Sequence, residues 1–260
     1  MPHLTRDGGK LYYEEAGSGN PPIVLIHGWC CDRTYVAPQV EHFAPAHRVV
    51  SVDLRGHGES DKPEKEYAIR GFADDVAWLC GELGITRPLV IGHSMGGATA
   101  LGLAAWHPGL PAAIVMLDAP VLLPEELVSA LLPQLMAAFR SPDYRDAARQ
   151  FVAAQMFRPG DDPARKERIL DGMSAAPQHV LASAFAAIGD FDSARALQAC
   201  TVPALFIGAD PLLPDLRRMR ELCPTLLTGQ TVGSGHFHQL EVPDQVNAMI
   251  ERFLATSVRA

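Results

Sequence analysis

The chain has few features of a secreted or membrane-spanning protein. No run approaches the roughly 18 apolar residues that a spanning helix needs, and residues 1–9 contain no apolar signal core. The five cysteines are an odd number and form no paired Cys-x-x-Cys framework. That pattern favours reduced thiols in a reducing compartment. The expected location is therefore the cytoplasm, with no membrane partner.

Positive charge is also scarce, because 22 Lys and Arg stand against 30 Asp and Glu, which gives a net charge of −8. Neither nucleic acid nor an anionic membrane surface is expected as the main partner of such a chain. The apolar fraction is 48 % over 260 residues, which is ordinary for a globular protein and sufficient for a sizeable core. With nucleic acid and anionic membranes disfavoured by the net charge, a small-molecule substrate is the expected partner.

Short apolar runs alternate with helical patterns in the first half of the chain. The runs occupy residues 23–26, 49–52, 89–91 and 113–117. Continuous runs of this kind are typical of parallel strands that are buried on both faces. Between the second and third runs, Phe72, Val76 and Leu79 recur at helical spacing. The alternation predicts an α/β fold with a doubly wound, mostly parallel sheet.

The strand pattern stops after Asp118. Residues 120–199 contain helix formers and turns without a clear strand, and strand character returns at residues 202–207. This interruption is far longer than one crossover connection needs. We therefore expect an inserted helical cap at 120–199, over a core formed by 1–119 and 200–260. Ordinary crossover helices without a lid role are the alternative.

The segment Gly92-His93-Ser94-Met95-Gly96 fits the pattern Gly-x-Ser-x-Gly. It follows an apolar strand and opens into a helix that starts with small residues, which is the context that the pattern requires. The glycines allow a turn too tight for side chains, and the turn lifts the serine hydroxyl out of the sheet. Ser94 is therefore the predicted nucleophile.

A serine hydroxyl is a weak nucleophile without a base. His236 directly follows Gly235 after the last predicted strand, and we expect it to be that base. His238 is the nearest rival, with a surface or supporting role as its alternative. The two could also form a His-x-His metal pair, but no third ligand is apparent. No metal and no organic cofactor is expected.

The developing oxyanion needs two backbone N–H donors. The amide of Met95, directly after the nucleophile, is one candidate. The amide of Trp29, at the end of the first apolar run, is the other, and Gly28 lets the backbone turn toward the site. We also expect His27, Gly28 and Cys30 to contact the substrate, although His27 could instead be a structural hydrogen-bonding residue.

Together these blocks resemble the α/β-hydrolase fold family. The resemblance runs through residues 27–29, the Asp53–Ser60 segment, the Ser94 turn and Gly235-His236. It implies the fold of that family and, within it, similarity to serine esterases and lipases, including short bacterial esterases. Haloalkane dehalogenases and epoxide hydrolases use an aspartate at the turn, so Ser94 argues against those branches.

The resemblance leaves two candidates for the triad acid, which lies between serine and histidine in the chain. Many relatives carry it after the strand that here is followed by Gly208-Ala209-Asp210, usually as Gly-x-x-Asp, and the spacing here is one residue short. Some relatives, including short bacterial esterases, place it where Asp118 stands. Asp118 is the preferred acid and Asp210 the alternative.

The predicted reaction is hydrolysis of a small-molecule carboxylic ester through an acyl-enzyme, as in a carboxylesterase. An enol-lactone, a thioester or a C–C bond could be cleaved by the same triad. The segment Trp29-Cys30-x-Asp32 also resembles the cofactor-free ring-cleaving dioxygenases of this fold, so an oxygenase is an alternative. A non-catalytic ligand receptor on the same fold is another.

Overall fold

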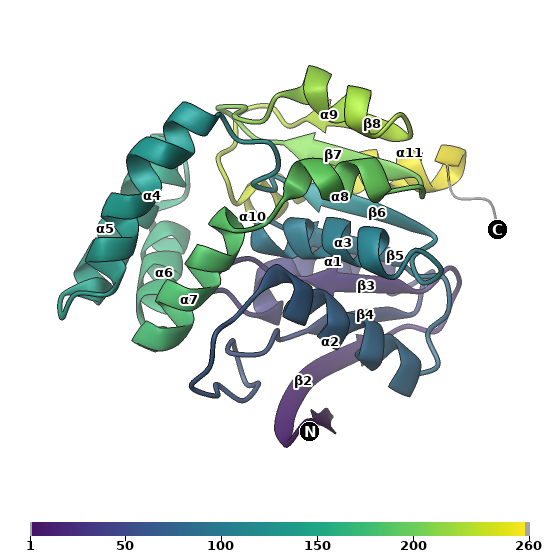
Figure 1. Ribbon diagram of the computed structural model, residues 1–260. Helices are drawn as coiled ribbons and strands as arrows, with labels where there is room; N and C mark the ends of the chain where they lie inside the picture. The colour runs from purple at the N-terminus through teal and green to yellow at the C-terminus, as the bar shows by residue number, and fades with distance from the viewer. Residues whose placement is uncertain (1, 258–260) are drawn as a thin grey trace.

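The computed structural model describes residues 2–257, apart from the side chain of Leu127. Within this range one sheet of eight strands has the order β1-β2-β4-β3-β5-β6-β7-β8 (Figure 1). The strands are β1 (His3–Arg6), β2 (Gly9–Ala16), β3 (Ile23–Ile26), β4 (Val49–Val52), β5 (Leu89–His93), β6 (Ala113–Leu117), β7 (Ala204–Gly208) and β8 (Leu226–Gln230).

Strands β3 to β8 run parallel to one another, which confirms the predicted fold class. All residues of β3, β4, β5, β6 and β7 are buried, as expected for strands covered on both faces. The antiparallel hairpin of β1 and β2, which was not predicted from the sequence, extends the sheet beyond β4. In β2 the neighbours Leu11 and Tyr12 are both buried, so the alternation that marks a half-exposed strand is absent.

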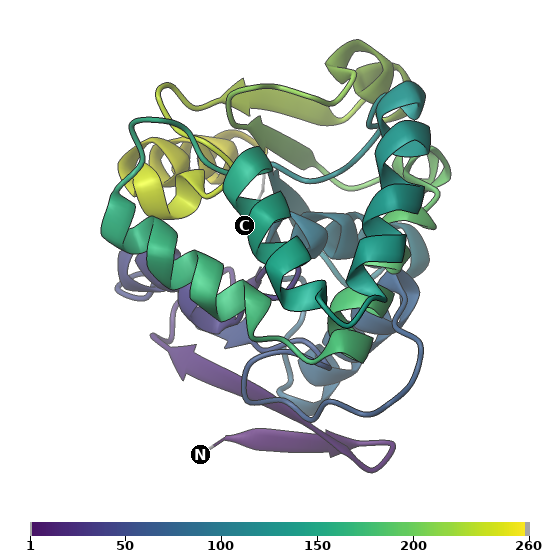
Figure 2. The same ribbon diagram turned by 90° about the vertical axis from the view of Figure 1, so that its left-hand side faces the viewer.

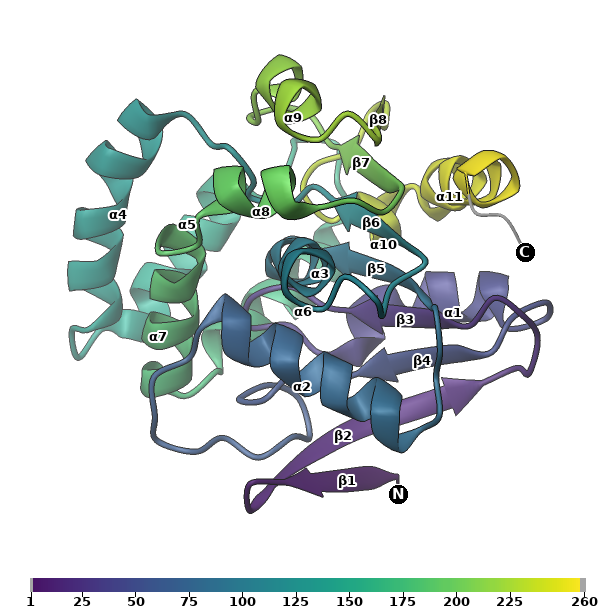
Figure 3. The same ribbon diagram turned by 45° about the vertical axis from the view of Figure 1, so that its right-hand side comes forward.

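Helices cover both faces of the sheet (Figure 3). One face packs against α2 (Ile69–Glu82), α3 (Met95–Trp106) and α8 (Ser193–Ala199). The other packs against α1 (Ala37–Phe43) and α11 (Pro243–Ser257). Alternate residues of each strand therefore belong to two separate apolar cores. None of the helices in the described range is both long and apolar enough to cross a membrane.

The elements between residues 120 and 199 are all helices. They are α4 (Glu125–Phe139), α5 (Tyr144–Gln155), α6 (Pro163–Ser174), α7 (Gln178–Gly189) and α8. The first four gather beyond the carboxyl ends of the parallel strands (Figures 1 and 2). Helix α8 instead packs on α3 beside the sheet. The helices that lie away from the sheet are thus α4–α7.

Candidate active site

Ser94 occupies the sharp turn between β5 and α3. Its backbone has φ 53° and ψ −121°, in the left-handed region that non-glycine residues rarely adopt. The N–H of Ser94 donates to the carbonyl of Leu117 at 2.8 Å, which ties the turn to the end of β6. A Cβ on Gly92 would lie 2.0 Å from the oxygen of Gly96, and one on Gly96 would lie 2.4 Å from the oxygen of Ile26. Side chains at these two positions would force the turn apart.

The side chains of Asp118 and His236 are hydrogen-bonded to each other at the same edge of the sheet. Oδ2 of Asp118 lies 2.7 Å from Nδ1 of His236, and 17 % of each side chain is exposed. The other carboxylate oxygen, Oδ1, accepts the N–H of Ala209 at 3.0 Å. Burial raises the pKa of Asp118, but the hydrogen bond and charge of His236 lower it by more, so the pKa lies below its usual value. The carboxylate is therefore ionised at neutral pH.

Asp210, the alternative acid, has a different partner. Its carboxylate forms an ion pair with Arg158, which lies between α5 and α6. The side chains of Asp210 and Arg158 are 47 % and 36 % exposed. Of the two aspartates, the structure brings Asp118 and not Asp210 to His236.

The main chain of His236 is held on two sides. Its N–H donates to the carbonyl of Met156 at 3.2 Å, and its carbonyl lies 2.9 Å from Nε2 of His93. His238, the rival base, is completely buried, and its Nδ1 lies 3.1 Å from Oγ1 of Thr231. Burial lowers the pKa of His238 to about 4, which leaves a neutral ring in a supporting position.

The backbone between Gly28 and Trp29 passes beside the nucleophile. A Cβ on Gly28 would lie 3.2 Å from Cβ of Ser94, so a side chain at this position would press on the nucleophile. The indole of Trp29 packs against α7, where its Nε1–H donates to the carbonyl of Leu181 at 2.9 Å. It also stacks on Phe139 with ring centroids 5.5 Å apart. The indole of Trp29 is thus held by α4 and α7, while its backbone belongs to the loop beside Ser94.

The contacts of His27 describe a structural role. The residue is completely buried. Its Nδ1–H donates to the carbonyl of Gly28 at 2.8 Å, and its Nε2 accepts the N–H of Leu54 at 3.0 Å. Both ring nitrogens of His27 thus have backbone partners, which favours the structural alternative over a contact with the substrate. The neighbouring Cys30 has a backbone φ of 53°, and burial raises the pKa of its thiol well above the usual value.

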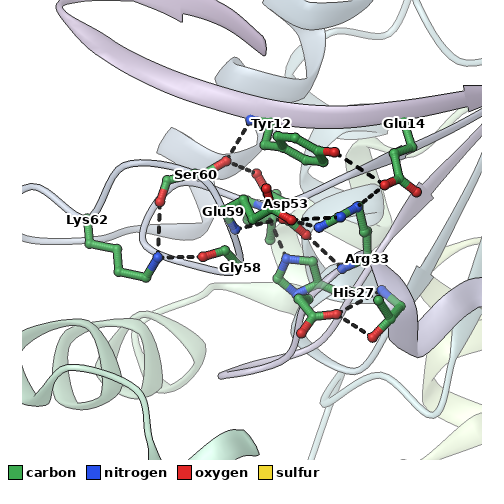
Figure 4. A network of polar contacts seen from close by, with 12 residues as sticks. Tyr12, Glu14, His27, Arg33, Asp53, Gly58, Glu59, Ser60 and Lys62 are labelled. Atoms are coloured by element: carbon green, nitrogen blue, oxygen red, sulfur yellow. Dashed lines mark hydrogen bonds and ion pairs between the residues drawn. The ribbon is translucent and has the colours of Figure 1, made fainter. Parts of the chain in front are cut away.

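A buried polar network supports the loop that carries Gly28 and Trp29 (Figure 4). Asp53 has no exposed surface, and its carboxylate accepts the N–H of Arg33 at 2.7 Å and the N–H of Glu59 at 2.8 Å. The guanidinium of Arg33 lies 2.9 Å from the same carboxylate. This network joins the residues after Trp29 to the Asp53–Ser60 segment. The resemblance includes the Asp53–Ser60 segment but gives no sign of Arg33, because its partner Asp53 lies 20 residues further along the chain.

Comparison with known proteins identifies the family. A model of the α/β hydrolase fold matches residues 21–243. The chain belongs to the α/β hydrolase fold family. This confirms the resemblance that the sequence motifs indicated.

Individual relatives cover nearly the whole chain. A pimeloyl-[acyl-carrier protein] methyl ester esterase of Xylella fastidiosa is 29 % identical, over 95 % of this chain and 99 % of its own length. The enol-lactonase from Burkholderia xenovorans LB400 is 25 % identical with a TM-score of 0.85, over 98 % of this chain and all of that one. A thermophilic esterase from Thermogutta terrifontis shares the fold over the full length of both chains, with a TM-score of 0.87 and 24 % identity.

Proposed function

We propose that the protein is a serine hydrolase that cleaves a carboxylic ester, with Ser94 as nucleophile, His236 as base and Asp118 as acid. The observation that carries the proposal is the 2.7 Å contact between Asp118 and Nδ1 of His236. This contact leaves Nε2 as the nitrogen available to the serine hydroxyl. Ser94 is tied to the same strand end, because its N–H bonds to the residue before Asp118.

The proposed reaction proceeds in two halves. Nε2 of His236 takes the Ser94 proton as the hydroxyl oxygen attacks the ester carbonyl, and Asp118 stabilises the imidazolium. The amides of Trp29 and Met95 donate to the oxyanion. The imidazolium then protonates the leaving alkoxide. Water attacks the acyl-enzyme with His236 again as base, which releases the acid and restores the Ser94 hydroxyl.

Cyclic esters are the second substrate class that the comparisons favour. The relative from Burkholderia xenovorans is an enol-lactonase, and it matches almost all of this chain. An enol-lactone presents the same acyl carbon to Ser94, and its leaving group stays attached to the acyl part. The aromatic side chains Trp29, Phe139 and Phe185, which pack together under the cap, favour a substrate with an apolar acyl part.

Replacing the nucleophile tests the proposal. Ser94→Ala should lower kcat for p-nitrophenyl acetate by at least about 10³-fold, because no other group can form the acyl-enzyme. Circular dichroism should show an unchanged fold. Ser129→Ala, at an exposed serine of the cap helix α4, is the matched control and should keep full activity. Retained turnover in Ser94→Ala would contradict the proposal. Oxygen uptake with a hydroxylated heterocycle would favour the dioxygenase instead.

A further inference from the structure

The side chain of His93 joins the turn that carries Ser94 to the loop that carries His236. Nε2 of His93 lies 2.9 Å from the main-chain oxygen of His236, and the two rings lie 4.7 Å apart between centroids. His93 is completely buried, so water does not compete for this hydrogen bond. The two residues are 143 positions apart in the sequence. The contact therefore fixes two distant parts of the chain against each other.

The partner of this hydrogen bond determines where the proton of His93 sits. A carbonyl oxygen can only accept, so Nε2 carries the proton. Burial, followed by the charge of His236, lowers the pKa of His93 well below its usual value. The ring is therefore neutral, and Nδ1 carries no proton. Across residues 2–257, no hydrogen-bond partner lies on Nδ1.

An unpartnered buried nitrogen costs free energy that an apolar side chain would avoid. The polar contact that offsets this cost is the one to His236. On its other side the ring faces Gly28, where a Cβ would lie 3.1 Å from Nδ1. His93 thus touches the loop of the proposed oxyanion donor as well as the loop of the base. An imidazole at this position is explained by the hydrogen bond it donates, not by packing alone.

We propose that His93 is a positioning residue for His236, an inference that rests on the proposed function. Its Nε2–H holds the carbonyl of His236 and so sets the distance between the base and the Ser94 hydroxyl. Because the N–H of His236 is bound to Met156 of the cap, the base is held between the serine turn and the cap. Loss of the His93 donor frees one of these two attachments and leaves the contact with Asp118 in place.

Two amide variants test whether the donor at Nε2 matters. His93→Gln and His93→Asn introduce the same primary amide, but only glutamine is long enough to place its nitrogen where Nε2 lies. We expect kcat for p-nitrophenyl acetate to fall on the order of 10- to 100-fold in His93→Asn and by less than about fivefold in His93→Gln, since a misplacement of about 1 Å can cost that much rate. The value of KM should change little in either variant.

Further measurements separate positioning from general damage. His93→Leu lacks both the donor and the unpartnered nitrogen. Its kcat should match that of the Asn variant, and its melting temperature should be no lower than that of the unaltered protein. The rate at which a fluorophosphonate forms an adduct with Ser94 should fall in the same proportion as kcat. His107→Asn, at a partly exposed histidine paired with Asp74, is the control and should keep the unaltered kcat.

The outcomes distinguish this inference from the proposed function. Equal kcat in the folded Gln and Asn variants, or unaltered kcat in His93→Leu, would overturn the positioning role of His93. The proposed function would still stand if Ser94 forms the adduct. If the unaltered protein forms no adduct on Ser94, both proposals are overturned.

Discussion

The ends of β6 and β7 lie side by side, and each is followed by an aspartate with a different environment. Asp118 directly follows β6, has a backbone φ of 44° and pairs with His236. Asp210 lies two residues beyond β7 and pairs with Arg158 in partly exposed surroundings. The β7 loop nevertheless contributes to the site, because the N–H of Ala209 bonds to Asp118. The end of β6 thus supplies the proposed acid, and the loop after β7 donates a hydrogen bond to it.

Removing the charge of Asp118 is expected to give the largest effect. Asp118→Asn keeps the size of the side chain but no longer favours the tautomer with the proton on Nδ1 or stabilises the imidazolium. We expect kcat for p-nitrophenyl acetate to fall by about 10³- to 10⁴-fold. Steady-state kinetics at pH 7 would measure this loss. A kcat close to that of the unaltered protein would mean that Asp118 is not the acid, and Asp118 and Asp210 would no longer differ in role.

The segment after β8 also carries His238, whose burial should make the stability of the protein depend on pH. The folded pKa of His238 is about 4, against about 6.5 in an unfolded chain. Between these values the unfolded state binds more protons, so the free energy of unfolding falls as pH falls from about 6.5 to 4. Above pH 6.5 this contribution is constant.

His238→Gln should remove a slope of up to about 1.4 kcal/mol per pH unit in this window. Urea unfolding at several pH values would measure the slope. The control for loss of a histidine at the surface is His42→Gln, at an exposed histidine of α1 that pairs with Glu251. An unchanged slope in His238→Gln would show that this histidine does not become protonated on unfolding.

Asp210→Asn should give the smallest effect. It breaks an ion pair between partly exposed side chains, and such pairs contribute about 0–1 kcal/mol to stability. We expect kcat to fall by less than about fivefold, since about 1 kcal/mol or less is involved. Arg158→Gln breaks the same pair from the other side and should behave alike. A loss in Asp210→Asn as large as that in Asp118→Asn would mean that Asp210 acts as the acid.

The central sheet could be predicted from the sequence because each buried strand is marked by its own run of apolar residues. The apolar runs at 23–26, 49–52 and 113–117 coincide with β3, β4 and β6, since a strand buried on both faces needs apolar residues throughout. The hairpin of β1 and β2 was not predicted because the burial pattern of β2 does not alternate. Glycines that flank a serine between strand and helix likewise mark a turn without reference to the rest of the chain.

The pairing within the site depends on contacts that local sequence does not encode. Asp118 and Asp210 each follow a buried strand, and the left-handed backbone at Asp118 cannot be recognised from the residue type. His93 occupies a variable position of its motif, and its partner lies at the far end of the chain. Arg33 and Asp53 meet only after the sheet has formed. These contacts join residues far apart in the sequence, so they are visible only in the folded chain.

Mass spectrometry after fluorophosphonate treatment tests the central claim most directly. The folded protein should gain one adduct per chain, and the peptide that contains Ser94 should carry it. Protein unfolded in urea should gain none, because the hydroxyl then lacks its base. A folded, unlabelled protein, or an adduct on another residue while Ser94 stays unmodified, would contradict a nucleophilic Ser94.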